Sequence, residues 1–252
     1  MSSFWRGKKV LVTGGAGFIG SHVVEKLVKR DADVTVFDNL QNGTINNLST
    51  VKKVVRLTEG DCRNLSVAEK ACRGKDVVLN LAARTGGVRY NREHPGLMLS
   101  ENLLIESSMI QSAQRSGVER FLAISSAVVY PENSSIPTPE KEGFLDQPEE
   151  VNKGYGWAKR MAELLGIYYQ EEFGMKVAIV RPYNCYGPRD HFFPLPTHVV
   201  PTLIRRVVDG EDPVAVWGTG NQTRAFLYVD DLVEGMLLAT EKYAVADPVN
   251  LG

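Results

Sequence analysis

The feature that most constrains the fold of this chain is an alternation of short β-branched runs with longer segments of helical periodicity. In the longer segments apolar residues recur at spacings of three and four, and charged residues occupy the remaining face. The short runs are almost uniformly apolar, as is typical of strands covered on both faces. The pattern predicts an α/β fold with a doubly wound parallel sheet. We expect strands at 9–12, 33–37, 54–57, 76–81, 120–125 and 176–181, and helices at 18–29, 66–72, 97–116 and 155–173.

A glycine-rich segment joins the first predicted strand to the first predicted helix. Gly14 allows a tight turn, Gly17 lets the backbone approach a pyrophosphate, and Gly20 lets the helix pack closely on the sheet. The helix N-terminus then faces the phosphate charge, with Phe18 and Ile19 in its first turn. An ordinary glycine-rich turn is the alternative, but the flanking strand and helix favour a Rossmann-like dinucleotide site. The segment reads Thr13-Gly14-Gly15-Ala16-Gly17-Phe18-Ile19-Gly20.

An acidic residue ends the second predicted strand. Asp38 can accept hydrogen bonds from both hydroxyls of an adenosine ribose, whereas a 2′-phosphate would meet a like charge there. Leu40 and Gln41 supply no arginine to neutralise such a phosphate, so NAD is favoured over NADP. Alternatively, Asp38 only caps a turn with Asn39.

A tyrosine and a lysine stand four residues apart on the last of these helices, and therefore share one face. The ammonium of Lys159 stabilises a phenolate, so Tyr155 can exchange a proton with an alcohol or ketone. Tyrosine and lysine also occur at this spacing on solvated helices. Here Ser126, after the fifth predicted strand, adds a hydroxyl at the carboxyl edge of the sheet, where ligands of open α/β sheets bind.

Together these residues resemble the extended short-chain dehydrogenase/reductase family, in its nucleotide-sugar epimerase and dehydratase branch. The resemblance spans nearly the whole chain, and the segments follow the family order. It implies a catalytic triad of Ser126, Tyr155 and Lys159, with Lys159 also binding the nicotinamide ribose. The segments that carry the resemblance are the glycine loop, Asp38-Asn39, Asn80-Leu81-Ala82-Ala83, Ser126, Tyr155 with Lys159, Arg181-Pro182-Tyr183-Asn184-Cys185-Tyr186-Gly187-Pro188, and Trp217-Gly218-Thr219-Gly220 with Arg224.

Further ligand contacts are expected around these segments. Asp61 lies after the third predicted strand, where an adenine contact and a simple turn are both plausible roles. By the resemblance, Asn184 and Arg224 contact the nucleotide-sugar, Arg224 at the diphosphate. His198 matches the partner acid of the fucose synthases, and a histidine at a helix N-terminus is its structural alternative. The remaining expected contacts are Cys62, Leu81, Ala82 and Ala83 for the cofactor and Arg84 for the substrate, whereas Arg84 and its neighbour Arg89 could instead be solvated.

The composition of the chain changes after residue 181. Prolines recur among aromatic and polar residues, which disfavours continuous sheet and indicates binding loops. We expect residues 1–181 to bind NAD and residues 182–252 to form mainly a smaller substrate lobe, partly interleaved with the first domain and incomplete at the C-terminus. This lobe should contain helices at 201–208 and 231–240, a strand pair around 218–221 and a strand at the end of the chain.

The residue two positions after the predicted catalytic serine selects among reactions. By resemblance, dehydratases carry an acid at Ala127 or Val128, and fucose synthases and mannose 3,5-epimerases carry a cysteine at Val128. Valine can neither donate nor accept a proton, so epimerisation at C4 through a transient 4-keto sugar is the leading expectation. A nucleotide-sugar 4-ketoreductase or a GDP-fucose-synthase-like enzyme is the alternative. A dinucleotide-sensing regulatory protein is a non-enzyme alternative that Tyr155 and Lys159 argue against.

Composition excludes several other classes. The net charge of −1, without a long basic run, gives no reason to expect nucleic acid or an anionic membrane as partner. Three cysteines without paired spacing indicate neither a disulfide framework nor a metal cluster. No apolar run is long enough for a membrane span, and we expect a cytoplasmic protein. The resemblance implies a homodimer through helices 97–116 and 155–173, although their apolar faces could equally be internal core.

Overall fold

A seven-stranded parallel sheet forms the centre of the computed structural model, which describes residues 3–192, 198–216 and 218–252. The strand order is β3-β2-β1-β4-β5-β6-β9, and every neighbouring pair runs parallel. This order confirms the predicted Rossmann-like doubly wound fold. The strands are β1 (Lys9–Thr13), β2 (Asp33–Asp38), β3 (Arg56–Glu59), β4 (Val77–Asn80), β5 (Arg120–Ile124), β6 (Lys176–Pro182) and β9 (Pro248–Leu251).

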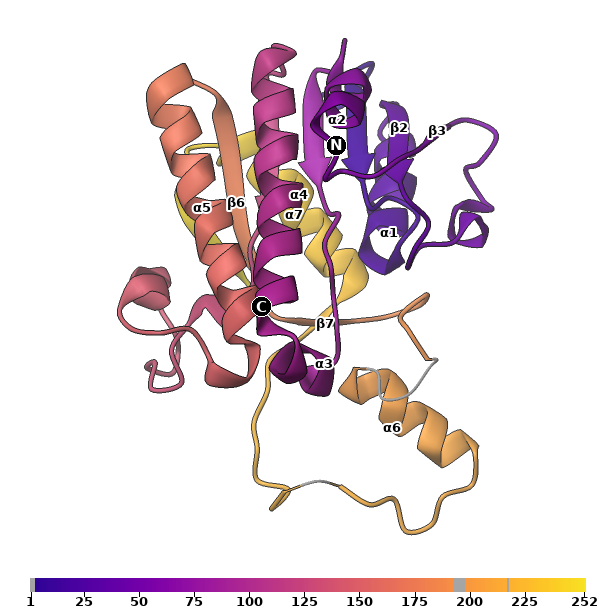
Figure 1. Cartoon of the computed structure of the whole chain (residues 1–252). Coiled ribbons are helices and arrows are strands. Elements are labelled where there is room, and N and C mark those ends of the chain that lie inside the picture. The colour runs from indigo at the N-terminus through magenta and orange to yellow at the C-terminus, as the bar shows by residue number, and fades with distance from the viewer. Residues whose placement is uncertain (1–2, 193–197, 217) are drawn as a thin grey trace.

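Helices cover both faces of the sheet, because successive strand residues point to opposite sides. In β1, Val10 and Val12 pack into the core that holds α1 (Phe18–Val28) and α7 (Val229–Lys242), and Leu11 packs into the opposite core. Figure 1 shows the long helices α4 and α5 side by side on the second face, with α7 behind the strands. The second face carries α2 (Leu65–Cys72), α4 (Pro95–Arg115) and α5 (Lys153–Phe173).

The third strand differs from the prediction. It begins at Arg56 rather than at residue 54, because Val54 and Val55 donate backbone hydrogen bonds to the carbonyl of Val51 and so close a turn. All four residues of β3 are exposed, whereas strands covered on both faces were expected. The reason is its place at the edge of the sheet, beyond the reach of the covering helices.

A short parallel pair leaves the carboxyl edge of the main sheet. It is formed by β7 (Asn184–Tyr186) and β8 (Phe226–Tyr228). The strand pair predicted around 218–221 is therefore wrong: residues 218–220 form a turn and a bend, with φ of +80° at Gly218 and at Gly220, a conformation that interrupts extended strand. Trp217 lies outside the described residues. Helix α6 (Val199–Val208) stands apart below the lower edge of the sheet (Figure 1).

The last elements return to the main layers. Helix α7 packs against α1, and β9 pairs with β6 in register from Ile179 opposite Pro248. The carboxyl ends of β1, β4, β5 and β6 consequently meet at one edge, at the bottom of Figure 1, and the loops that follow them hold most of the predicted site residues.

Candidate active site

The backbone of the glycine loop between β1 and α1 packs closely on its neighbours. Gly14 adopts a φ of +64°, and a Cβ there would lie 2.9 Å from the backbone nitrogen of Ala82. A Cβ on Gly20 would lie 2.1 Å from the carbonyl oxygen of Gly14, so only glycine fits at both places. Gly17 is the residue before α1, and since glycine has no side chain, no side chain caps the start of this helix. The backbone N–H groups at this helix start, including those of Phe18 and Ile19, lack partners within the helix and suit a pyrophosphate. These features fit NAD.

The carboxylate of Asp38 is fixed at the end of β2. It is 6% exposed, and its two oxygens accept backbone hydrogen bonds from Ala16 at 2.9 Å and from Leu40 at 2.8 Å. The bond from Leu40 is the turn contact given above as the alternative role of Asp38. The bond from Ala16 ties the same carboxylate to the glycine loop. Asn39 is exposed and accepts from the backbone of Gln41 at 3.0 Å.

In the segment after β3, Asp61 forms a surface ion pair, whereas the next residue, Cys62, is buried. Asp61 forms an ion pair with Arg63, at 2.6 Å between Oδ2 and Nη2, which lowers the pKa of its carboxyl. Arg63 also reaches Glu101 on α4 at 3.1 Å. Cys62 is buried in the core under α2 and α4, and burial raises the pKa of its thiol. The sequence alone gave no sign of the partner of Asp61.

The tyrosine, the lysine and the serine sit around the end of β5. The Lys159 ammonium donates a 2.7 Å hydrogen bond to the carbonyl oxygen of Ile124 and lies 5.4 Å from the ring centre of Tyr155. Ser126 follows two residues later, and its hydroxyl accepts from the backbone of Val128 at 3.3 Å. Lys159 is buried, whereas Tyr155 and Ser126 are half-buried and so remain open to a ligand. One helix and one strand end thus bring an ammonium, a phenol and the backbone of the serine loop to the same edge.

A buried chain of hydrogen bonds connects the glycine loop to α4. Thr13 donates to Asn80 at 2.6 Å and accepts from the backbone of Ala82 at 3.0 Å. Asn80 in turn donates to Glu106 of α4 at 2.8 Å. Leu81, Ala82 and Ala83 are half-buried directly after β4, beside the glycine loop. Sequence reasoning missed Glu106, although a glutamate on the apolar face of a helix is a signal that can be looked for.

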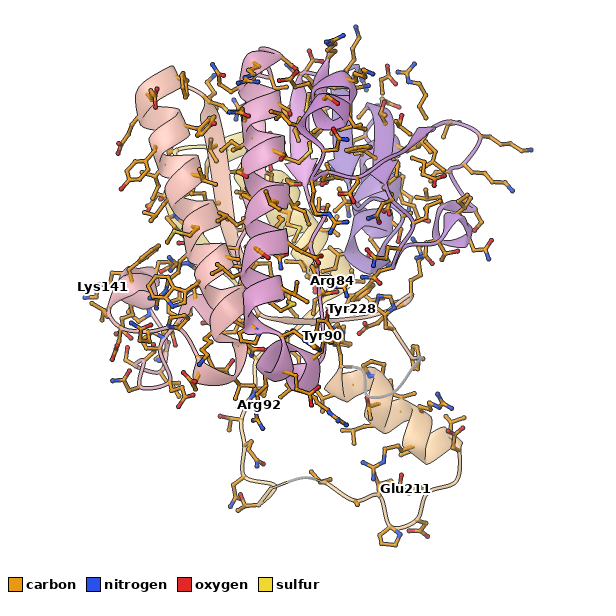
Figure 2. The ribbon with its side chains drawn as sticks, viewed as in Figure 1. Arg84, Tyr90, Arg92, Lys141, Glu211 and Tyr228 are labelled. Atoms are coloured by element: carbon orange, nitrogen blue, oxygen red, sulfur yellow. The ribbon has the colours of Figure 1, made fainter. Side chains whose placement is uncertain are left out.

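The loop after β4 leads into a helix that was not predicted, α3 (Val88–Glu93). The guanidinium of Arg84 lies over the ring of Tyr90, 5.4 Å from its centre, and donates to its hydroxyl at 3.0 Å. The Arg84 backbone is held by Asn102, through bonds of 2.9 and 3.0 Å. Arg84, Tyr90 and Tyr228 all lie below the carboxyl edge of the sheet, on the side of α6 (Figure 2). Arg89 is exposed and pairs with Glu93 at 2.8 Å.

The small sheet brings two of the predicted substrate residues together. Asn184 opens β7 and donates to the carbonyl oxygen of Ala225 at 3.3 Å, immediately beside Arg224. Both side chains are exposed, and the Arg224 guanidinium contacts the carbonyl oxygen of Thr223 at 2.7 Å.

A histidine and a buried aspartate form a pair near the start of α6. His198 Nδ1 lies 2.9 Å from Oδ1 of Asp190, whose side chain is 1% exposed while that of His198 is 61% exposed. The hydrogen bond that His198 donates to the Asp190 carboxylate raises the pKa of His198 above its ordinary value of 6.5. Asp190 also lies close enough to Cys185 to contribute to the raised pKa of that thiol, about 12, whose main cause is burial.

A buried ion pair supports the loop that carries Ser126. Arg181 contacts Glu163 at 2.7 and 2.8 Å, and neither side chain is more than 2% exposed. Glu163 also accepts from Ser125, and Arg181 donates to the hydroxyl of Tyr130 at 2.8 Å. Tyr130 donates to Asn250 of β9 at 2.6 Å, so this network joins the serine loop to the far strand of the sheet.

Comparison with known proteins agrees with this architecture. The Streptomyces dTDP-4-dehydro-6-deoxy-D-allose reductase is 32% identical over 95% of this chain and 75% of its own length. The Arabidopsis thaliana GDP-L-fucose synthase 1 is 32% identical over 97% of this chain and 72% of its own. Among solved structures, the UDP-N-acetylglucosamine 4-epimerase of Methanobrevibacter ruminantium, in complex with UDP-N-acetylmuramic acid, superposes with a TM-score of 0.87 at 30% identity, covering 98% of this chain and 77% of that one.

A doubly wound sheet with a phosphate-binding glycine loop and a tyrosine–lysine pair at its carboxyl edge defines a dinucleotide-dependent enzyme. The sequence model of the NAD dependent epimerase/dehydratase family matches residues 10–252, and the chain belongs to that family. Within the described residues, no helix is both long and apolar enough to cross a membrane. Nor do three or more histidine, cysteine, aspartate or glutamate side chains gather there in a way that could hold a metal ion.

Proposed function

We propose that this protein interconverts nucleotide-activated sugars that differ in configuration at C4, through a transient 4-keto sugar. The observation that carries the proposal is the Lys159 ammonium, bonded to the Ile124 carbonyl and lying beneath the Tyr155 ring at the carboxyl edge of the sheet. A phenol beside a fixed ammonium can act as a general acid and base towards a sugar hydroxyl. The 4-epimerases among the solved relatives support the same reaction.

The roles of the residues follow from their positions. NAD, held by the residues named below, would supply the acceptor and donor for a hydride at the sugar carbon. Tyr155 takes the proton of the 4-hydroxyl, and Ser126 donates a hydrogen bond to the same oxygen. Lys159 stabilises the phenolate and holds the nicotinamide ribose. Asp38 binds the adenosine ribose, and the N-terminus of α1 holds the pyrophosphate.

The nucleotide-sugar is proposed to lie below the carboxyl edge, between the loop after β4 and the small sheet. Arg84 on one side, and Asn184 with Arg224 on the other, supply donors for a sugar and a diphosphate. Asp61 and Cys62 border the adenine end of the cofactor, and Asp61 is paired with Arg63 there. We also propose that the protein is a cytoplasmic homodimer, with residues 182–252 serving mainly the substrate.

A 4-ketoreductase is the second candidate, and two observations favour it. The dTDP-4-dehydro-6-deoxy-D-allose reductase and the GDP-L-fucose synthase are among the similar sequences. The His198–Asp190 pair also supplies an acid that a simple 4-epimerase does not need. Two incubations followed by proton NMR test the choice: one with NAD and a panel of nucleotide-sugars, the other with NADH or NADPH and 4-keto nucleotide-sugars. Formation of the 4-epimer supports the epimerase, whereas stoichiometric consumption of NADH or NADPH with a 4-keto sugar supports the reductase.

A further inference from the structure

A buried carboxylate lies behind the candidate site and is only half satisfied. Glu106 of α4 is 3% exposed, and its Oε2 accepts a 2.8 Å hydrogen bond from Asn80. Its Oε1 is also buried and has no hydrogen-bond partner among the described residues. A buried polar atom without a partner costs free energy, which calls for a compensating role.

The charged group that acts on Glu106 is the predicted catalytic lysine. Burial raises the pKa of Glu106 to about 7, and the ammonium of Lys159 on α5 acts against that rise. Lys159 is itself 6% exposed, so its charge also needs compensation. Glu163, one turn further along α5, is bound on both oxygens by Arg181. Glu163 is thus already paired, whereas Glu106 has one oxygen without a hydrogen-bond partner among the described residues.

Glu106 also reaches the dinucleotide loop through hydrogen bonds. Its partner Asn80 accepts from Thr13, the residue directly before Gly14. Thr13 accepts in turn from the backbone of Ala82, the segment against which Gly14 packs most closely. A displacement of Glu106 would be transmitted to both strand ends that flank the pyrophosphate site.

We propose that Glu106 is a positioning residue, which orients the Thr13–Asn80 pair beneath the glycine loop and balances the buried charge of Lys159. It touches neither substrate nor cofactor and acts through these neighbours. The inference rests on the proposed function, in that Lys159 is taken to work with Tyr155. An ionised Glu106 weakens the positive potential that Lys159 exerts at the phenol, whereas a protonated Glu106 leaves that potential in full.

The first test needs neither substrate nor turnover. Glutamate carboxyl carbons are labelled with ¹³C in the cofactor-free protein, and the Glu106 resonance is assigned by its absence in Glu106→Gln or by its contacts to Asn80. We expect this carboxyl to titrate near pH 7, and to titrate at higher pH in Lys159→Met, because the ammonium is gone. Lys153→Met, an exposed lysine of the same helix that pairs with Glu150, should not move it. Titration near the ordinary value of 4.5, or no response to Lys159→Met, would overturn the proposal.

The second test separates this inference from the proposed function. Glu106→Gln can keep the hydrogen bond to Asn80 but lacks the charge, so the acidic limb of its kcat profile should move to lower pH. Glu171→Gln makes the same chemical change at an exposed position of α5 and should keep the wild-type profile. If Tyr155→Phe is inactive while both glutamine variants share one profile, the inference fails alone. If Tyr155→Phe retains turnover, the proposed function fails, and the carboxyl titration still decides the placement of Glu106. Should Glu106→Gln not fold, the titration of the wild-type protein decides alone.

Discussion

Lys159 and Ile124 are joined by a 2.7 Å hydrogen bond from a side-chain ammonium to a backbone carbonyl. The bond fastens the first turns of α5 to the last residue of β5, and Ser126 follows that residue on the chain. The side chains proposed to be catalytic, from a helix and from a strand end, are thereby held in a fixed relation at the edge where open parallel sheets bind ligands.

Removal of the Tyr155 hydroxyl should abolish turnover and leave cofactor binding nearly unchanged. Tyr155→Phe keeps the ring over Lys159 but removes the exchangeable proton. Turnover is followed by NMR and NAD binding by calorimetry. Tyr168→Phe is the matched control, because Tyr168 lies on the same helix and is 54% exposed. Activity retained in Tyr155→Phe would show that another group is the acid and base.

Asp38 should make the protein prefer NAD(H) to NADP(H) by at least about tenfold, which corresponds to about 1.4 kcal/mol. A 2′-phosphate would approach a carboxylate that two backbone N–H groups hold in place. Asp38→Asn should reduce this preference, whereas Asp33→Asn, at the half-buried start of the same strand, should not. Equal calorimetric affinities of the wild type for the two cofactors would contradict the assignment.

His198 should stabilise the folded protein in a pH-dependent way. Its pKa is raised in the folded state, so its contribution is fully present below about pH 6.5 and is lost as the pH rises through the folded pKa. Denaturant unfolding of wild type and His198→Gln should therefore differ most at low pH and converge at high pH. In Asp190→Asn, NMR titration of the imidazole should show a lower pKa than in the wild type. A difference that grows with pH would refute the pairing.

The buried Arg181–Glu163 pair should be costly to break. Replacement of one partner leaves the other charge buried, so Arg181→Met should lower the free energy of unfolding by about 3–5 kcal/mol. The exposed pair between Arg115 and Glu69 provides the control, for which Arg115→Met should cost about 1 kcal/mol or less. Similar losses in the two variants, measured by urea unfolding, would mean that the Arg181 pair does not support the serine loop as described.

The sequence predicted the parts of the fold that local chemistry determines. The glycine loop, the acidic end of β2 and the tyrosine–lysine spacing depend on residues adjacent in the chain or one helical turn apart, and the structure has them at these places. The exposure of β3 could not be predicted, because it depends on which strand lies at the sheet edge.

Long-range contacts between polar residues could not be predicted from the sequence either. The chain from Thr13 through Asn80 to Glu106 joins residues that are 67 and 26 positions apart. Parallel pairing of β7 with β8 also closes a long loop, and the strand pair expected around 218–221 is absent because residues 218–220 form a turn and a bend. Such contacts follow from the packing of elements that are distant in sequence.

Val128 separates the proposed reaction from its nearest rivals. Proton abstraction at C3 or C5 beside a ketone requires a positioned acid or base, and an aliphatic side chain supplies none. The backbone N–H of Val128 donates to the Ser126 hydroxyl and its carbonyl oxygen lies close to Gly156 of α5, so this residue is fixed beside Ser126. The unmodified enzyme is therefore expected to act at C4 alone.

The most direct measurement follows the hydrogen atoms of the sugar. A nucleotide-sugar carrying deuterium at C4 is incubated with the protein and NAD in ordinary water, and the unlabelled sugar is incubated in deuterated water. The account predicts that the 4-epimer forms, that deuterium at C4 is retained through hydride return, and that C3 and C5 gain no deuterium from solvent. Loss of the C4 label, or deuterium at C3 or C5, would contradict the 4-epimerase assignment and favour a fucose-synthase-like reaction.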